Sequence, residues 1–164
     1  GEGWGIEGPH IEEAVLEIPR DRFMTFDLER QFFLEQQFDL VVSLEVAEHL
    51  HALSAGLFVR SLTSLAPVVL FSAAIPFQGG VHHLNEQWPE YWAALFQQYG
   101  YVPIDCLRRR IWTNQDVDWW YAQNTLLYVS GDRLADYPLL EKEWERLGGA
   151  PLAIVHPRRY LLSR

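Results

Sequence analysis

Residues 38–50 read Phe-Asp-Leu-Val-Val-Ser-Leu-Glu-Val-Ala-Glu-His-Leu, and this stretch decides the fold. Its apolar run at 40–42 leads into Ser43 and Leu44 and predicts a buried strand that stops abruptly there. The acidic and imidazole side chains that follow lie at helical spacing, namely Glu45, Glu48 and His49. A strand that ends in such side chains is typical of open α/β sheets, whose ligands bind outside the carboxyl ends of the strands.

Strand-like and helix-like segments alternate along the rest of the chain. Apolar runs predict strands at 4–6, 22–26, 38–44 and 68–74. The helical spacing of apolar residues predicts helices at 10–16, 47–65, 86–99 and 137–147. Two more strand-like runs, at 103–111 and 121–129, are able to pair antiparallel. This order predicts a doubly wound α/β sheet with helices on both faces and a C-terminal antiparallel strand pair.

Length and composition predict one globular domain over residues 1–164. Hydrophobic residues make up 49% of the chain and charged residues 21%, which is ordinary for a soluble protein. The formal net charge of −9 argues against general nucleic-acid binding, because it repels a phosphate backbone. The single cysteine, Cys106, rules out an internal disulfide, and no apolar run has transmembrane length. We therefore expect a cytoplasmic protein without a membrane partner.

Acidic residues also end the two earlier predicted strands. Glu7, followed by Gly8, ends the first, and a carboxylate there is able to accept hydrogen bonds from both hydroxyls of a ribose. Asp27 ends the second, where an acid suits an exocyclic adenine amine and Leu28 supplies apolar contact. Each acid also has a simpler interpretation, Glu7 as a solvated residue in a turn and Asp27 as a helix N-cap.

The order of these segments resembles that of the class I S-adenosylmethionine-dependent methyltransferases, in which Phe-Asp-Leu-Val-x-x-x-x-Val-x-Glu-His-Leu is a frequent form of the fourth strand. The resemblance covers nearly the whole chain and implies a Rossmann-like sheet with S-adenosylmethionine as cofactor. It also implies which residues hold the ribose, the adenine and the methionine part of the cofactor. These are, in turn, Glu7 with Gly8, Asp27 with Leu28, and Ser43 with Leu44 and Glu45.

Two histidines, His82 and His83, lie in a glycine-containing loop predicted at 75–85. In the methyltransferases this loop usually lies over the acceptor pocket, so either histidine is a candidate general base; otherwise both are surface or capping residues. Glu45, Glu48 and His49, with one of these histidines, are also a candidate site for a divalent cation. A Glu-x-x-Glu-His set binds metal in some methyltransferases that act on vicinal hydroxyls, whereas in metal-free relatives Glu48 and His49 brace the helix.

The strongest motif of that family, a first strand with a Gly-x-Gly-x-Gly loop, is missing. Glycines alternate at positions 1, 3 and 5, but too little sequence precedes them for a strand and no helix separates them from Glu7. We therefore expect a partial domain that is truncated at its N-terminus. Because the first strand is central in the family's sheet, its loss predicts two half-sheets with unpaired edges.

The resemblance implies transfer of a methyl group from S-adenosylmethionine to an oxygen or nitrogen of an acceptor. Net charge and aromatic content favour a small-molecule or glycan-like acceptor, and the oligomeric state stays open. One alternative is a non-catalytic methyltransferase-like domain that binds or regulates a partner, or an inactive fragment. Another is a different nucleotide-binding α/β enzyme, such as an NAD-dependent one.

Overall fold

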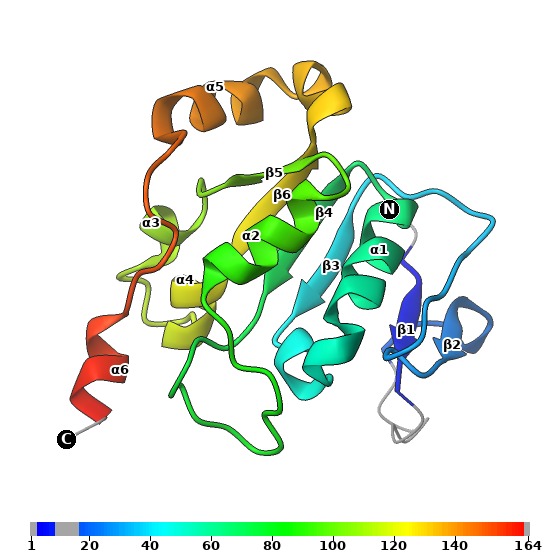
Figure 1. The fold of residues 1–164 in the computed structure, drawn as a ribbon, viewed down its shortest axis with the longest axis horizontal. Helices are drawn as coiled ribbons and strands as arrows, with labels where there is room; N and C mark the ends of the chain where they lie inside the picture. The colour runs from blue at the N-terminus through cyan, green and yellow to red at the C-terminus, as the bar shows by residue number, and fades with distance from the viewer. Residues whose placement is uncertain (1–2, 9–16, 163–164) are drawn as a thin grey trace.

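Two separate sheets form the framework of the computed structural model, which describes residues 3–8 and 17–162. The larger sheet has the order β3-β4-β6-β5, in which β6 runs antiparallel to both neighbours and β3 is parallel to β4. The smaller sheet pairs β1 with β2 in parallel. The architecture is therefore α/β with a mixed four-stranded sheet (Figure 1). The strands are β1 (Gly5–Glu7), β2 (Phe23–Thr25), β3 (Val41–Leu44), β4 (Val68–Ser72), β5 (Tyr101–Ile104) and β6 (Leu126–Ser130).

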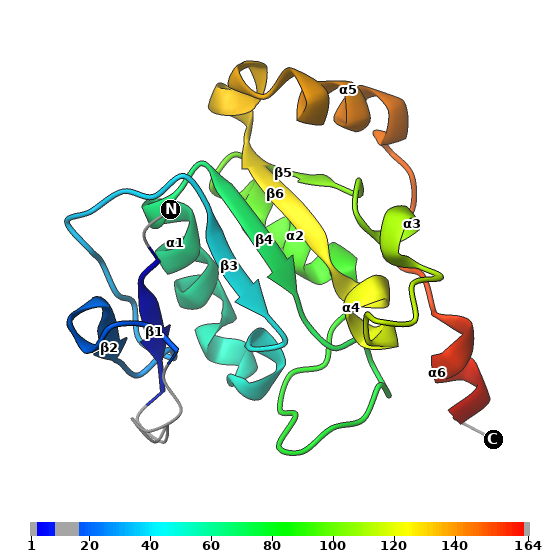
Figure 2. The same ribbon diagram turned by 180° about the vertical axis from the view of Figure 1, so that it is seen from behind.

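The two sheets lie side by side, with β1 next to β3. Both strands point in the same direction, as the views from the two sides agree (Figure 1, Figure 2). Within the described part of the chain, β1 pairs only with β2, and β3 pairs only with β4. The predicted division into two half-sheets is thus confirmed, and one edge of each sheet faces the other.

Two helices, α1 (Ala55–Leu65) and α2 (Pro89–Gln97), cover the face of the larger sheet that Figure 1 presents. Their buried side chains recur at helical spacing, as the sequence predicts, and pack against alternate residues of the strands. The ring of Phe96 stacks on that of Tyr128 with 3.8 Å between centroids. The residues that meet in this core include Phe58, Leu62, Trp92, Phe96, Val69, Phe71, Leu126 and Tyr128.

A second, smaller core lies on the opposite face. There Leu134 of η5 (Gly131–Asp136) packs with Val68 and Val129, and Leu140 of α5 (Pro138–Leu147) adds to the cluster. Helices therefore lie on both faces, as expected. This second cover does not extend over β3, where the side chain of Val42 is 56% exposed.

The predicted helix at 47–65 is wrong over its first eight residues. Two short 3-10 turns, η3 (Ala47–His49) and η4 (Ala52–Ser54), precede α1. The backbone N–H of His51 donates to Oε1 of Glu29 at 2.8 Å instead of to a carbonyl of the preceding turn. Because a helix needs that carbonyl bond, the capture of His51 by Glu29 delays the start of the regular helix.

The two C-terminal strands are antiparallel neighbours, as predicted, but both are shorter than expected. Residues after β5 form α3 (Arg108–Ile111), and α4 (Trp119–Asn124) comes before β6. Arg108 is fully buried and its Nη2 lies 2.7 Å from Oδ2 of Asp105, so the ion pair closes a turn at the end of β5. Of the three consecutive arginines, Arg108 is therefore buried at the start of a short helix, whereas Arg109 and Arg110 are exposed.

The remaining elements differ from the predictions in smaller ways. The helix predicted at 86–99 is found as the shorter α2, and the one at 137–147 as α5. A turn of 3-10 helix, η2 (Arg20–Arg22), precedes β2, and α6 (Pro157–Leu162) forms in a tail for which the sequence predicted no structure. The helix predicted at 10–16 lies outside the described residues. Across residues 3–8 and 17–162, none of the helices combines the length and apolar character that crossing a membrane requires.

The aromatic core gives a direct test of this packing. Replacing Phe96 by alanine should lower the free energy of unfolding by about 3–5 kcal/mol, because a fully buried ring is lost from a stacked cluster. Urea denaturation measures this loss. The matched variant Leu53→Ala, at a side chain that is 97% exposed, should stay within about 0.5 kcal/mol of the parent chain. Equal losses in the two variants would contradict the packing described here.

Candidate functional site

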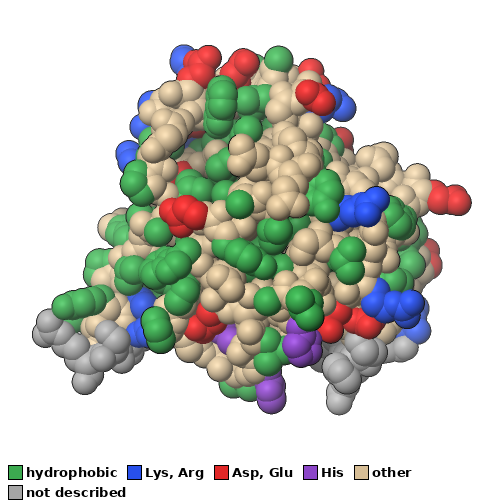
Figure 3. Space-filling view, in the orientation of Figure 1, with side chains coloured by type: hydrophobic (Ala, Val, Ile, Leu, Met, Phe, Trp, Pro, Cys, Tyr) green, Lys and Arg blue, Asp and Glu red, His purple; other side chains and the backbone are tan. Residues whose placement is uncertain are grey.

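The carboxyl ends of β3 and β4 meet at one edge of the larger sheet, and the loop at 75–88 folds over them. Backbone N–H groups of Leu84 and Asn85 both donate to the carbonyl oxygen of Glu48, at 2.8 and 2.9 Å. A third bond runs from the N–H of Gln87 to the carbonyl of Ala74 at 3.1 Å. The loop is thus fastened to the turn after β3. Histidine side chains gather beside acidic ones along this lower edge (Figure 3).

Glu48, His49 and His83 form a cluster of possible metal ligands at this edge. One ligand atom from each side chain lies within 4.8 Å of the others. The rings of His49 and His83 meet edge to face, with centroids 4.9 Å apart. Glu48 is fully buried, and no hydrogen bond of ordinary geometry reaches either of its carboxylate oxygens within the described residues; only the backbone N–H groups of Glu48 and Ala74 lie near enough to favour its charge. A buried carboxylate is costly without a well-formed hydrogen bond, so these two oxygens are the atoms that most need a cation or a donor.

The surroundings of His83 fix its position. Its Nδ1 lies 2.9 Å from Oε1 of Glu86, and the other carboxylate bonds of Glu86 come from backbone N–H groups of Phe77 and Gly79. Gly80 packs directly beneath the imidazole, where a Cβ atom would collide with Nε2 of His83. His82 contributes differently, because its carbonyl oxygen lies 3.3 Å from Nδ1 of His49 while its side chain is exposed. The structure therefore assigns His83, and not His82, to the cluster.

Backbone conformation around the cluster is unusual. Among residues 3–8 and 17–162, three non-glycine residues have positive φ angles, Glu45 at 53°, Phe77 at 64° and His82 at 60°. All three lie in the two segments that form the cluster, the turn after β3 and the loop after β4. Left-handed conformations of such residues carry a cost and persist only where the surrounding structure holds them, often at functional sites.

Glu45 is held by a network of side-chain amides. Asn124 donates to its Oε1 at 3.1 Å, and Gln78 donates to its Oε2 at 3.1 Å. Gln123 in turn donates to Oε1 of Gln78 at 3.0 Å. The cluster of ligand atoms does not include Glu45, whose carboxylate braces the site. The sequence alone does not predict this role for the three amides. Two of them, Gln123 and Asn124, are adjacent polar residues just before an apolar run, which is the one pattern that hints at a buried polar contact there.

Burial, with a further contribution from the negative charge of Glu45, raises the pKa of Glu48 from 4.5 to about 8. The carboxyl group therefore holds a proton near neutral pH when no cation is present. Any cation that binds there has to displace this proton.

The residues implied for the cofactor converge in part. Glu7, Leu28 and Ser43 line one cavity of about 290 Å³ between β1 and β3. Ser43 is buried, and its Oγ has no hydrogen-bond partner within the described residues. Four other implied residues are not in the lining: Gly8, Asp27, Leu44 and Glu45. Gly8 donates its N–H to Glu7, and the exposed Asp27 accepts the N–H of Glu29 in a local turn.

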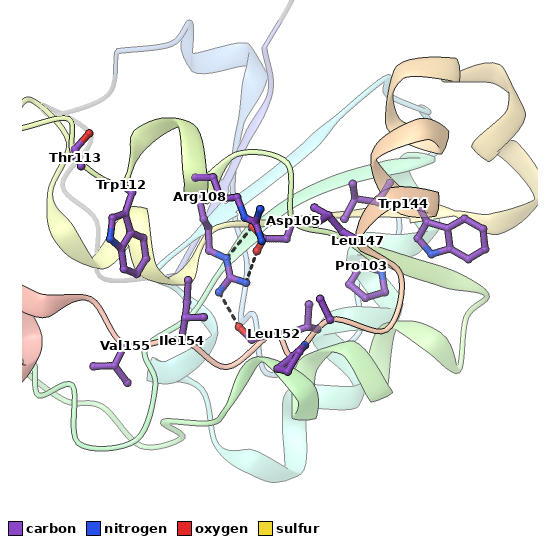
Figure 4. Close-up of a pocket in the computed structure, with 14 residues that line it drawn as sticks. Pro103, Asp105, Arg108, Trp112, Thr113, Trp144, Leu147, Leu152, Ile154 and Val155 are labelled. Carbon is purple, nitrogen blue, oxygen red and sulfur yellow. Dashed lines mark hydrogen bonds and ion pairs between the residues drawn. The ribbon is translucent and has the colours of Figure 1, made fainter.

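A larger cavity of about 620 Å³ lies at the opposite side of the sheet, between α3, α5 and the segment 150–155 (Figure 4). Arg108 points toward it, but its guanidinium already donates to both carboxylate oxygens of Asp105 and to the carbonyls of Gln123 and Leu152. Trp112 and Trp144 lie toward opposite ends of the lining (Figure 4). This arginine therefore ties together three segments of the chain and is not a free anion ligand.

No protein-family model matches the chain, and no curated protein matches its sequence.

The buried carboxyl of Glu48 predicts a distinctive pH dependence of stability. Because the folded state holds this proton more tightly than the unfolded state, the free energy of unfolding should fall as pH rises from about 4.5 to about 8. One such proton contributes a slope of about 1.4 kcal/mol per pH unit. The variant Glu48→Gln has no such proton, so its stability relative to the parent chain should rise across this interval. Urea denaturation at a series of pH values measures the difference, and a constant difference would contradict the raised pKa.

Proposed function

We propose that this protein is an S-adenosylmethionine-dependent methyltransferase that acts on an oxygen or nitrogen of a small-molecule or glycan-like acceptor. The observation that carries the proposal is the meeting of two sets of residues at the carboxyl end of β3. On one side Glu7, Leu28 and Ser43 line a cavity, and at the strand end Glu48, His49 and His83 converge. The resemblance of residues 38–50 to the methyltransferases supports the same function.

The residues around the cavity suit a nucleoside-containing cofactor. The carboxylate of Glu7 retains an oxygen for a ribose hydroxyl, since Oε1 accepts the N–H of Gly8. Leu28 offers an apolar contact to a base, and Ser43 offers a buried hydroxyl that lacks a partner in the described residues. S-adenosylmethionine would supply an electrophilic methyl group on a sulfonium. We assign Glu45 a bracing role, because its carboxylate is engaged with two amides.

The donors of the cluster suit a divalent cation. Glu48 provides a carboxylate that no hydrogen bond of ordinary geometry reaches within the described residues, and His49 and His83 each provide an imidazole nitrogen. Ligand atoms bound to one ion at about 2.1 Å lie roughly 3–4 Å apart, so a spread within 4.8 Å requires only a small adjustment. A bound cation would lower the pKa of an acceptor hydroxyl and orient it. Mixed nitrogen and oxygen donors favour Mn²⁺, Fe²⁺ or Zn²⁺ over Ca²⁺.

The residues of this chain would act mainly by positioning. The loop at 75–88, fastened to Glu48, places His83 and holds the acceptor end of the site over the end of β3. Methyl transfer relies on proximity and alignment of the acceptor with the sulfonium, so a general base is optional. We assign His83 to the cation. A hydroxyl bound to that cation needs no general base, so the role predicted for His82 and His83 is not required.

The net charge and the single cysteine support a cytoplasmic location.

One observation favours the non-catalytic alternative. The cavity beside Ser43 holds about 290 Å³, at the lower limit of pockets that bind small ligands. A methyltransferase-like domain that binds a partner and no cofactor would have such a cavity.

Cofactor binding separates these possibilities. S-adenosylhomocysteine should raise the melting temperature of the chain in a concentration-dependent way, and NAD should not. Glu7→Gln should weaken the shift, because it removes a charged acceptor for the ribose hydroxyls, whereas the exposed Glu17→Gln should leave it unchanged. A chain that melts cooperatively and responds to neither ligand would instead support the non-catalytic domain.

Cation binding tests the cluster separately. Mn²⁺ should bind the parent chain at pH 8, as measured by calorimetry or by its electron paramagnetic resonance signal. Glu48→Gln and His83→Asn should each weaken binding at least about tenfold, because each removes a ligand. Gly80→Ala should also weaken it by displacing the His83 ring. His82→Asn is the matched control, and equal losses in His82→Asn and His83→Asn would contradict the assignment.

A further inference from the structure

The larger cavity, of about 620 Å³, lies at the β5 edge of the larger sheet, which is the edge opposite β3. Small-molecule sites typically have volumes of about 300–1,000 Å³, so this cavity has room for a ligand. Within the described structure its lining shares no residue with the cavity beside Ser43 or with the cation cluster. A ligand of this cavity would therefore occupy a second, separate site.

The segment 150–155 forms one wall of this cavity and has no regular secondary structure. Side chains from elsewhere in the fold hold it in place. Nη1 of Arg108 donates to the carbonyl oxygen of Leu152 at 2.8 Å. In addition, Oε1 of Glu90 in α2 accepts the backbone N–H groups of Leu152 and Ala153, at 3.1 and 2.8 Å. The segment is thus tied to two helices, and the cavity has a fixed wall.

Helix α5 contributes apolar side chains to the cavity, and these side chains are only partly covered. Leu140, Trp144 and Leu147 recur at helical spacing, which places them on one face of the helix. Trp144 and Leu147 line the cavity, yet no residue of α5 is buried and Trp144 is 39% exposed. An amphipathic helix normally packs its apolar face against a core. Part of this face is left open to whatever occupies the cavity.

The charged groups of the lining leave one arginine open to a ligand. Asp105 and Arg108 compensate each other, because the guanidinium donates to both carboxylate oxygens. Arg109 also lines the cavity and is exposed, and no acidic side chain in the described part of the chain forms an ion pair with it. The next residue, Arg110, lies outside the lining, with its Nη2 3.8 Å from Oε1 of Glu143. The cavity thus combines apolar walls with one uncompensated positive charge.

We infer that this cavity binds a small, largely apolar molecule that has an aromatic ring and one anionic group, such as a carboxylate or a sulfonate. Trp112 and Trp144, toward opposite ends of the lining, offer aromatic surfaces against which a ring packs favourably (Figure 4). Arg109 supplies the counter-charge, and a guanidinium suits such an anion. Because the chain carries a net charge of −9, it retains an anion only beside a local positive charge. The inference does not depend on the proposed methyl transfer.

A matched pair of fluorescent probes tests the ligand class. Anilinonaphthalene sulfonate has aromatic rings and one sulfonate, and phenylnaphthylamine has the same rings without the sulfonate. Both probes fluoresce more strongly in an apolar site, so each can be titrated into the folded chain. The sulfonate should bind saturably, with one site per chain, under conditions where the chain melts cooperatively. Absence of saturable binding would overturn the inference.

Two adjacent arginines test the role of the charge. Arg109→Gln should weaken binding of the sulfonate about three- to tenfold, because it removes a charge-assisted bond, and should leave binding of the uncharged probe unchanged. Arg110→Gln is the matched control, at an exposed arginine outside the lining, and should change neither affinity. Equal losses in the two variants would contradict an anion held by Arg109.

Two tryptophans test the location. Trp144 lines the larger cavity and Trp4 lines the cavity beside Ser43, and each is 39% exposed. Trp144→Ala should therefore weaken binding of both probes at least about threefold, whereas Trp4→Ala should weaken neither. Unchanged melting temperatures would show that both variants fold. A greater loss in Trp4→Ala than in Trp144→Ala would place the probes in the other cavity and overturn the inference.

Discussion

The buried carboxyl group of Glu48 is the constraint on which the site depends. Burial makes the charged form of this carboxyl unfavourable, the nearby charge of Glu45 adds to that cost, and the backbone groups of Glu48 and Ala74 offset only part of it, so its pKa is raised. The chain nevertheless uses the backbone of the same residue as an anchor, since its carbonyl accepts two N–H groups of the following loop. Anchoring the loop there brings His83 to the one place where a cation would satisfy the carboxylate.

The amide network around Glu45 explains how this arrangement is maintained. Glu45 has a left-handed backbone, and its N–H bonds the carbonyl and hydroxyl oxygens of Ser72 at the end of β4. Its carboxylate is held by Gln78 from the loop and Asn124 from α4. Three segments that are distant in sequence are thereby fixed to the turn after β3. The hydrogen bonds of this network offset the cost of the strained backbone at Glu45. Loss of any member would leave buried polar groups unpaired.

The sequence predicts the features that depend on local pattern and fails on those set by distant partners. The apolar runs at β3 and β4 and the spacing in α2 give the core of the larger sheet, and the ligand types after β3 are visible in the chain. The end of β5 cannot be predicted from the local sequence, because Arg108 donates to backbone carbonyls that lie 15 and 44 residues away in the chain. The late start of α1 likewise follows from Glu29, which is 22 residues from His51.

The choice between His82 and His83 shows the same limit on a smaller scale. Adjacent histidines are equivalent in the sequence, yet the positive φ at His82 directs its carbonyl to His49 and leaves its side chain exposed. Gly80 leaves room for the His83 ring because it has no Cβ atom, and the contact with Glu86 orients that ring. The residue types therefore predict a cation site, but the backbone conformation of the loop determines which histidine belongs to the cluster.

The two parts of the proposed site differ in how much they depend on the unpaired edge of β3. The cluster of Glu48, His49 and His83 is held from the side of β4, by Ser72 and by the loop, so it is formed while the other edge of β3 has no strand partner. The cavity at Glu7 and Ser43 has that open edge as one wall, because β1 and β3 are not joined by hydrogen bonds. The cluster is thus held by the larger sheet alone, whereas the cavity depends on how the two sheets lie relative to each other.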